Sequence, residues 1–239
     1  MAEFEMPVVY EAGNGPQGLE IADFNNDGLL DVLAAKRFGD SVSVFFGNGD
    51  GTLQSPLSQY GGDEPIDVAS MDYNGDGYLD IAIAAARDDE LRILQGDGSG
   101  VFTLFLVFQV GERPVSVIAD DFDADGDIDI ATANFNSDDL SVVFGFQNTF
   151  MSERRFAAGD GPLAIRTVSR SSDAVLGLAI SNTSGGDFSL QLDRCVPVCA
   201  IDLNGDGLLN FFDVSLFLGA YTDSDPLADF TGDGLFNFF

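Results

Sequence analysis

Three Asp-rich segments place oxygen-bearing side chains at the spacing that a short loop needs to surround a hard cation. They span residues 23–31, 72–80 and 121–129, each 49 residues after the previous one, and we call them the first, second and third Asp loops. Asp or Asn stands at loop positions one, three and five, Asp at position nine, and Gly at position six. Alternate side chains of such a loop point inward, the backbone carbonyl at position seven adds an oxygen, and the Gly permits the sharp turn.

This pattern predicts one bound Ca²⁺ in each Asp loop. Ca²⁺ takes about six to eight oxygen ligands in flexible geometry, whereas Mg²⁺ retains several of its water ligands. The alternative is a metal-free turn rich in Asp and Asn, but such a turn requires about one or two of these residues rather than four at fixed spacing. The expected ligands, including the backbone carbonyl at position seven, are Asp23, Asn25, Asp27, Leu29, Asp31, Asp72, Asn74, Asp76, Tyr78, Asp80, Asp121, Asp123, Asp125, Asp127 and Asp129.

The Asp loops belong to a longer repeat. Four prolines mark it, at spacings of 49, 49 and 48 residues: Pro16, Pro65, Pro114 and Pro162. An alternating strand follows each proline, and the Asp loop then leads into a second and a third strand. A Gly-rich turn follows the third strand, and a short outer strand completes the repeat. The expected outer strands are 8–13, 57–61, 108–111 and 155–159. Four short strands in a period of this length are typical of one blade of a β-propeller.

The fourth repeat keeps the strand pattern but loses the chemistry of the loop. Its loop, residues 169–177, has Ser169 and Ser171 at positions one and three, Gly177 at position nine, and Arg170 between them. We therefore expect no metal in this loop, since Arg170 would repel a cation. A blade that persists without the ion favours a structural role for the metal in the other three.

The repeats resemble the FG-GAP or VCBS repeats of integrin-α-like β-propellers. The resemblance extends over about residues 6–190 and is carried by the three Asp loops and by the turn Phe46-Gly47-Asn48-Gly49-Asp50-Gly51-Thr52. It implies antiparallel blades around a common axis and structural Ca²⁺ in the loops. Propellers of this family usually have more blades than the four repeats visible here. Either further blades precede the chain, or the unit is four-bladed or an open arc.

A different Asp-rich pattern begins after Leu192. Residues 202–213 form a twelve-residue loop that ends in Asp, and a short amphipathic helix is expected at 214–221, in the manner of an EF-hand. A second copy begins at Asp229, 27 residues later, and stops before its twelfth position, so we expect the chain to be truncated. The expected ligands are Asp202, Asn204, Asp206, Leu208 and Asp213, and, in a weak or empty second site, Asp229, Thr231 and Asp233.

This C-terminal pair resembles a type I dockerin, which implies docking to a cohesin partner and assembly of polysaccharide-degrading complexes. Phe pairs at 211–212 and 238–239 stand where cohesin-binding dockerins often carry small polar residues, so a calcium-dependent anchoring or sorting module is an equal alternative. Cys195 and Cys199 either bridge each other or pair beyond residue 239. The expected domains are propeller repeats at 1–192, a linker at 193–199 and the dockerin-like pair at 200–239.

Composition excludes several classes of function. The net charge of −30 opposes binding to nucleic acid or to an anionic membrane. The absence of His removes His-based acid–base catalysis and His-ligated zinc. The longest mostly apolar run, 101–110, is too short to cross a bilayer. No signal peptide is visible, but loops of this kind suit millimolar extracellular Ca²⁺, so we expect a secreted or cell-surface protein whose export signal lies outside the chain.

The expected fold class is mainly β: a partial β-propeller of four-stranded antiparallel blades, followed by a small α-helical calcium module. The expected function is a non-catalytic, extracellular, calcium-binding adhesion module with a protein or glycan ligand. One alternative is part of a polysaccharide-degrading enzyme or complex, which would use loop acids such as Asp88, Asp89, Glu90, Asp138 and Asp139. No pattern pairs these acids with the apolar pocket that pKa tuning needs, so we expect no catalysis. A structural surface repeat is the other alternative.

Overall fold

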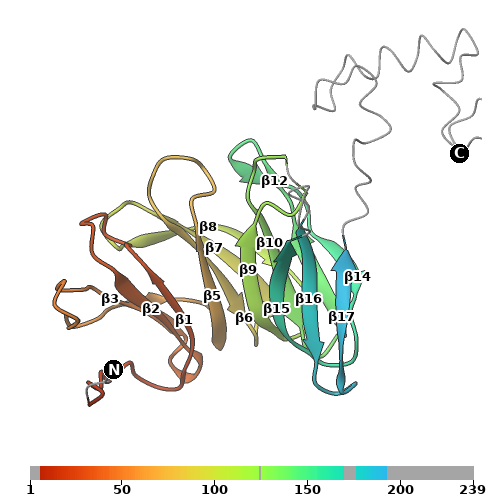
Figure 1. The fold of residues 1–239 in the computed structure, drawn as a ribbon, viewed down its shortest axis with the longest axis horizontal. Helices are drawn as coiled ribbons and strands as arrows, with labels where there is room; N and C mark the ends of the chain where they lie inside the picture. The colour runs from red at the N-terminus through yellow and green to blue at the C-terminus, as the bar shows by residue number, and fades with distance from the viewer. Residues whose placement is uncertain (1–5, 124, 170–175, 193–239) are drawn as a thin grey trace, which may run out of the picture. The chain divides into compact units, whose positions relative to one another are not determined.

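The computed structural model describes residues 6–123, 125–169 and 176–192, whose strands form successive antiparallel sheets (Figure 1). Blade one has the strand order β1-β2-β3-β4, and blade two has the order β5-β6-β7-β8. The strands of blade one are β1 (Pro16–Ala22), β2 (Asp31–Lys36), β3 (Ser41–Phe45) and β4 (Leu57–Tyr60), with a short 3-10 turn, η1 (Arg37–Gly39), between β2 and β3. The strands of blade two are β5 (Pro65–Met71), β6 (Asp80–Ala85), β7 (Glu90–Gly96) and β8 (Phe102–Gln109).

Blades three and four continue the same arrangement. Blade three has the order β9-β10-β11-β14, and blade four has the order β15-β16-β17. The strands of blade three are β9 (Pro114–Asp120), β10 (Asp129–Asn134), β11 (Asp139–Val143) and β14 (Arg154–Ala157), with a hairpin of β12 (Gly145–Phe146) and β13 (Thr149–Phe150) before β14. The strands of blade four are β15 (Pro162–Ser169), β16 (Leu176–Asn182) and β17 (Asp187–Leu192). The fold is therefore mainly β, with four blades in a propeller arrangement.

The four prolines that mark the repeat each begin the first strand of a blade, as expected. One predicted strand is wrong: residues 8–13 form no strand. The equivalent runs in later repeats pair with the third strand of the preceding blade, as β4 pairs with β3, and no such strand precedes residue 8 in the described chain. Tyr10 instead accepts a hydrogen bond from the Leu53 amide at 3.0 Å and packs edge-on against Phe45.

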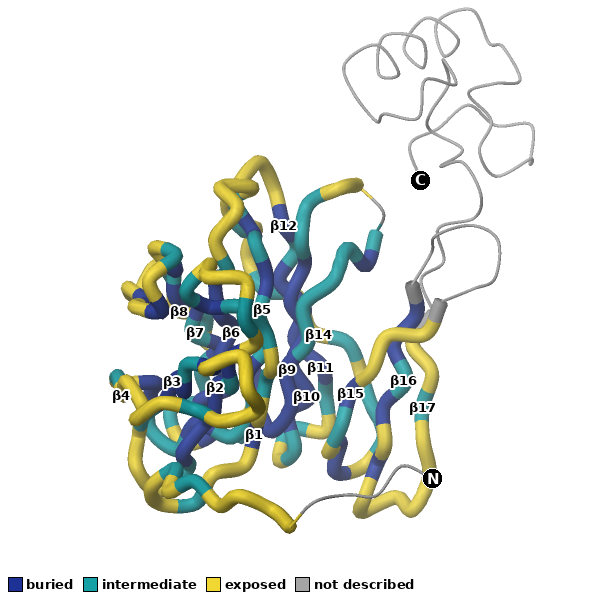
Figure 2. Tube along the Cα trace, turned by 60° about the vertical axis from the view of Figure 1, so that its left-hand side comes forward, coloured by how far each residue is buried: buried dark blue, intermediate teal, exposed yellow. Residues whose placement is uncertain are grey.

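The hydrophobic core lies between neighbouring blades. All six residues of β6 are buried because blades one and three cover its two faces. Ile81 and Ile83 pack towards blade one, whereas Ala82 and Ala84 pack towards blade three. Figure 2 shows this burial along the middle strands and the exposed residues in the loops. A third cluster joins blades three and four and includes Ile165.

The Asp loops are anchored to this core through their second residue. Phe24, Tyr73 and Phe122 occupy loop position two, and each is buried in the cluster on one side of its blade. Burying a Phe side chain contributes about 1.5 to 3 kcal/mol to folding. The loop is therefore held in place at one end by apolar packing.

The first strand of each blade lies nearest the propeller axis. β5 lies against both β1 and β9, and β9 lies against β15. The described part of the chain contains no helix with the length and hydropathy that a membrane-spanning helix requires. The predicted linker at 193–199, the module at 200–239 and its helix at 214–221 fall outside the described residues.

Candidate calcium loops

The carboxylate at loop position one lies inside the curve of its own loop. In the first loop, Asp23 accepts hydrogen bonds from the amides of Asp27 at 3.1 Å and Gly28 at 2.7 Å. In the second loop Asp72 accepts the two equivalent amide hydrogens at 3.2 and 2.9 Å. In the third loop Asp121 accepts them at 3.2 and 3.0 Å. The predicted inward orientation of position one is therefore present in all three loops.

The side chain at position three turns inward in the same way. Asn25 and Asn74 each accept a hydrogen bond through Oδ1 from the position-five amide, at 3.1 and 2.9 Å. Asp123 makes the equivalent bond to the Asp125 amide at 3.3 Å. These bonds also occur in metal-free Asp and Asn turns, so the feature that separates the two interpretations is position nine.

Position nine carries a fully buried carboxylate that joins two separate segments. One oxygen of Asp129 accepts a hydrogen bond from the Phe122 amide, and the other from the Gly145 amide, both at 2.8 Å. Asp31 and Asp80 make the same pair of bonds, to the position-two amide and to a Gly amide sixteen residues further along the chain. Each buried Asp therefore ties its Asp loop to the turn after the third strand.

Two of these buried carboxylates, Asp80 and Asp129, are costly to keep charged. Burial raises the pKa of Asp129 to about 7 and the pKa of Asp80 to about 6, although two backbone hydrogen bonds to each act in the opposite direction. Nearby acids raise the pKa further, including Asp123 beside Asp129 and Asp76 beside Asp80. Within the described chain, no Lys or Arg forms an ion pair with either residue. A cation at the loop would favour the charged form.

The third loop brings three carboxylates together. Oxygens of Asp121, Asp123 and Asp129 lie within 4.8 Å of one another. Carboxylate oxygens are the donors that a hard divalent cation prefers, so these residues fit the Ca²⁺ that the loop pattern implies. Asn25 and Asn74 replace the third carboxylate in the other two loops, where an amide oxygen supplies a neutral donor instead.

Two further aspartates of the third loop, Asp125 and Asp127, accept backbone hydrogen bonds through their side chains. Asp125 accepts the amide hydrogen of Asp127 at 2.9 Å. The loop pattern predicts a role only for the backbone carbonyl of Asp127, as a metal ligand. In the structure its side chain also accepts the Gln147 amide hydrogen at 2.8 Å. The loop is therefore also tied to the β12–β13 hairpin, a contact that the loop pattern did not predict.

Several predicted positions lie outside the described residues. Residues 170–175 of the fourth loop are among them, so the prediction that this loop binds no metal stays a prediction. So do the C-terminal ligands Asp202, Asn204, Asp206, Leu208, Asp213, Asp229, Thr231 and Asp233.

A second set of aspartates has a structural role that the sequence analysis did not predict. Asp40, Asp89 and Asp138 recur at 49 residues in the turn after the second strand, each with a positive φ of 47°, 56° and 56°. Their carboxylates accept the backbone amide hydrogen of the residue before the next blade's proline, at 3.2, 2.8 and 2.7 Å. These turn aspartates therefore connect each blade to the start of the next, and their regular spacing was the signal that could have revealed them.

The loop acids that an enzyme would need are engaged in similar contacts. Asp88 accepts the Asp63 amide hydrogen at 2.9 Å. Glu90 pairs with Arg92 at 2.7 Å, and Asp139 pairs with Arg155 at 3.5 Å.

The family comparison matches the repeats at the level of the loops. The model described as FG-GAP-like repeat matches residues 23–83 and 72–132. Each match begins on the first residue of an Asp loop and ends in the second strand of the next blade, β6 or β10. Residues 23–132 therefore contain FG-GAP-like repeats. None of the curated proteins matches this chain.

Solved structures with a similar fold include BBS1N in complex with ARL6DN. The mercury-soaked crystal has a TM-score of 0.54 at 12% identity, covering 79% of this chain and 61% of that chain. The lead-soaked crystal has a TM-score of 0.52 at 12% identity, covering 78% and 55%. At this identity the similarity shows the fold alone. This chain thus spans 55% to 61% of the length of these structures.

Proposed function

We propose that this chain is a non-catalytic binding module whose Asp loops hold structural Ca²⁺. The observation that carries the proposal is the third loop, where oxygens of Asp121, Asp123 and Asp129 converge within 4.8 Å. The buried Asp129 has no basic partner in the described chain, so a divalent cation is the group that would offset its charge.

Bound Ca²⁺ would supply charge neutralisation and rigidity rather than chemistry. Residues at positions one, three, five, seven and nine would hold it in each loop. Because position nine also ties the loop to the turn after the third strand, a filled loop would fix the end of the blade. Each site adds about 2.7 kcal/mol to the free energy of unfolding when free Ca²⁺ is about a hundredfold above its dissociation constant.

The wider role that we propose is extracellular adhesion. The propeller would present its faces to a protein or glycan, and the Asp-rich pair at 200–239 would attach the chain to a cohesin-like partner or to the cell surface. A net charge of −30 would be offset in part by calcium outside the cell. The structural contacts of Asp88, Asp89, Glu90, Asp138 and Asp139 support a non-catalytic role.

The test is a calcium titration of the full chain by calorimetry, with a thermal melt in excess chelator, in millimolar Ca²⁺ and in millimolar Mg²⁺. We expect a rise in melting temperature that is specific for Ca²⁺. The double substitution Asp121→Asn and Asp123→Asn should remove or strongly weaken one bound ion per chain. Asp160→Asn, an exposed Asp outside the loops, controls for the loss of one charge and should leave the titration unchanged.

Two results would contradict the proposal. One is a melting temperature that Mg²⁺ raises as much as Ca²⁺. The other is a double variant that binds as many calcium ions, with the same affinities, as the unaltered chain.

A further inference from the structure

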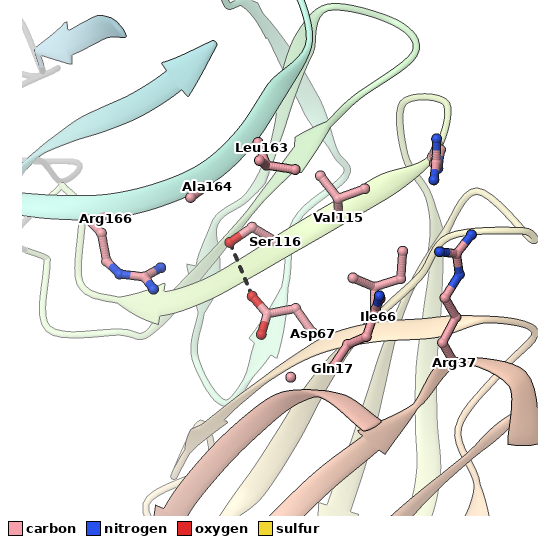
Figure 3. A pocket seen from close by; sticks show the side chains of 11 residues that line it. Gln17, Arg37, Ile66, Asp67, Val115, Ser116, Leu163, Ala164 and Arg166 are labelled. Carbon is pink, nitrogen blue, oxygen red and sulfur yellow. Dashed lines mark hydrogen bonds between the residues drawn. The ribbon is translucent and has the colours of Figure 1, made fainter. Parts of the chain in front are cut away.

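The first strands of all four blades border one open cavity of about 490 Å³ (Figure 3). This volume lies within the range of about 300 to 1,000 Å³ that small-molecule sites occupy. Its polar lining includes Gln17 of β1, Arg37 of η1, Asp67 of β5, Arg113 and Ser116 at the start of β9, and Arg166 of β15.

Three of the ten basic residues of this acidic chain line the cavity. Arg37 pairs with Glu64 of the next blade at 3.0 Å. The guanidinium of Arg113 stacks over Phe135 at 5.3 Å, and Arg166 donates to the Ile165 carbonyl at 2.7 Å. Neither Arg113 nor Arg166 forms an ion pair within the described residues. Because guanidinium remains charged, both side chains keep donors for an anionic group of a ligand.

The fold itself does not require an arginine at position 113. The equivalent residues before the other three prolines are Gly15, Glu64 and Gly161, and all four have a positive φ between 51° and 65°. Gly adopts this conformation without strain, whereas a residue with a side chain is uncommon there. Blades one and four use Gly, so the Arg113 side chain serves something other than the turn.

The centre of the cavity has groups that suit hydroxyls and a sugar ring. One oxygen of Asp67 accepts hydrogen bonds from the Ser116 hydroxyl and the Val117 amide, both at 3.1 Å. Its other oxygen has no hydrogen bond within the described residues and can accept one from a hydroxyl. Val115 and Leu163, the latter 48% exposed, add apolar surface. Figure 3 shows Asp67 and Ser116 between Arg37 and Arg166, which lie at opposite ends.

We propose that this cavity binds a short segment of an acidic glycan. Arg113 and Arg166 would bind carboxylates of successive acidic sugars through charge-assisted, two-pronged hydrogen bonds. Asp67 would accept hydrogen bonds from sugar hydroxyls, and Val115 and Leu163 would contact the ring faces. This assignment rests on the proposed role as a binding module but does not require calcium in the Asp loops.

The negative charge of the chain does not prevent such binding. Surface charges are screened over about 8 Å at physiological ionic strength, so remote acids repel the ligand weakly. Direct contact with a guanidinium acts over a distance shorter than this screening length. Affinity is therefore set by the arginines at the cavity rather than by the net charge.

The experiment is a calorimetric titration of the full chain with digalacturonate at physiological ionic strength. Cellobiose is the neutral disaccharide control, and a titration into protein-free buffer corrects for calcium bound by the uronate. The variants are Arg113→Gly, which introduces the residue that blades one and four use, and Arg166→Gln on an exposed side chain. Arg154→Gln on β14 is the matched control, because Arg154 also stacks over a phenylalanine and also lacks an ion pair in the described chain.

We expect digalacturonate to bind and cellobiose not to bind. Arg113→Gly and Arg166→Gln should each weaken the affinity about tenfold or more, with Arg154→Gln unchanged. Equal binding of the two disaccharides, no binding of digalacturonate, or equal loss in Arg154→Gln would overturn the proposal. Tighter binding of a tri-glutamate peptide would assign the cavity to an acidic protein instead. If the chain binds digalacturonate but neither binds Ca²⁺ nor gains melting temperature from it, the metal sites are refuted and the cavity assignment stands.

Discussion

The carboxylates of Asp31, Asp80 and Asp129 each accept two backbone hydrogen bonds while fully buried. Each therefore stabilises two segments, the Asp loop and the turn after the third strand. In Asp80 and Asp129 the same burial makes the charged form costly when no cation is near. At the scale of the residue, this conflict is what a bound cation would resolve.

The conflict predicts an unusual pH dependence for the calcium-free chain. Asp129 and Asp80 have pKa values of about 7 and about 6 in the folded chain, above the ordinary value of 3.8. The folded state therefore binds protons more tightly than the unfolded state, and this contribution to stability is lost as pH rises through the folded pKa. We expect the free energy of unfolding in excess chelator to fall between about pH 5 and about pH 7.5.

Urea unfolding at several pH values in this range measures the effect. The Asp129→Asn variant cannot titrate at this position, so its profile should be flatter than that of the unaltered chain. Saturating Ca²⁺ should also flatten the profile, because it favours the charged carboxylate. A calcium-free stability that rises with pH across this window would show that the buried aspartates are not held with raised pKa values.

At the scale of the element, the turns after the third strands show why Gly recurs beside the buried aspartates. Gly47, Gly96 and Gly145 donate their amides to position nine. A Cβ on Gly96 would meet the backbone carbonyl of Leu79, and the other two positions meet equivalent carbonyls. Close backbone approach, rather than a positive φ, is therefore what restricts these positions to Gly.

We expect Gly96→Ala to lower the free energy of unfolding by about 2 to 3 kcal/mol, because backbone atoms cannot yield as a flexible side chain can. Denaturant unfolding in Ca²⁺ measures the change. Gly75→Asn is the matched control: Gly75 has open space around its Cβ position and a φ of 70°, and Asn26, at the equivalent position of the first loop, has a φ of 60°. The control should change stability by less than about 0.5 kcal/mol. Similar losses in both variants would refute the close-approach explanation.

At the scale of the whole molecule, the blades depend on one another because the core lies between them. β6 is buried on both faces, whereas β17 carries Phe188 and Leu190 at 71% and 51% exposed. Stability in such an arrangement is greatest where both faces of a sheet are covered.

We therefore expect backbone amides of β17 to exchange hydrogen with solvent about tenfold faster, or more, than amides of β6 and β10. Hydrogen exchange followed by mass spectrometry on the full chain measures this difference. The matched comparison is β3, an equivalent third strand with four of its five residues buried. Equal protection of β17 and β3 would mean that β17 is covered as well as β3 is.

Much of the blade could be predicted because its determinants are local. Proline at the start of each first strand, alternating apolar residues and the Asp loops repeat every 48 or 49 residues, so strand order followed from the pattern. The prediction of a strand at 8–13 failed because a strand also needs a pairing partner, which a sequence pattern does not supply. The inward-facing side chains of the Asp loops were predictable for the same local reason, since they bond to amides within five residues.

The repeat, most of the strands and the inward-facing side chains of each Asp loop could be read from the sequence, because they depend on residues close in the chain. Only the tertiary structure decided what distant residues do together. In the folded chain, Asp40, Asp89 and Asp138 accept hydrogen bonds from backbone amides more than twenty residues away. It also placed arginines from three blades around one cavity, although 129 residues separate Arg37 from Arg166. The curvature of neighbouring blades brings their first strands together, and no local pattern encodes which side chains then share that space.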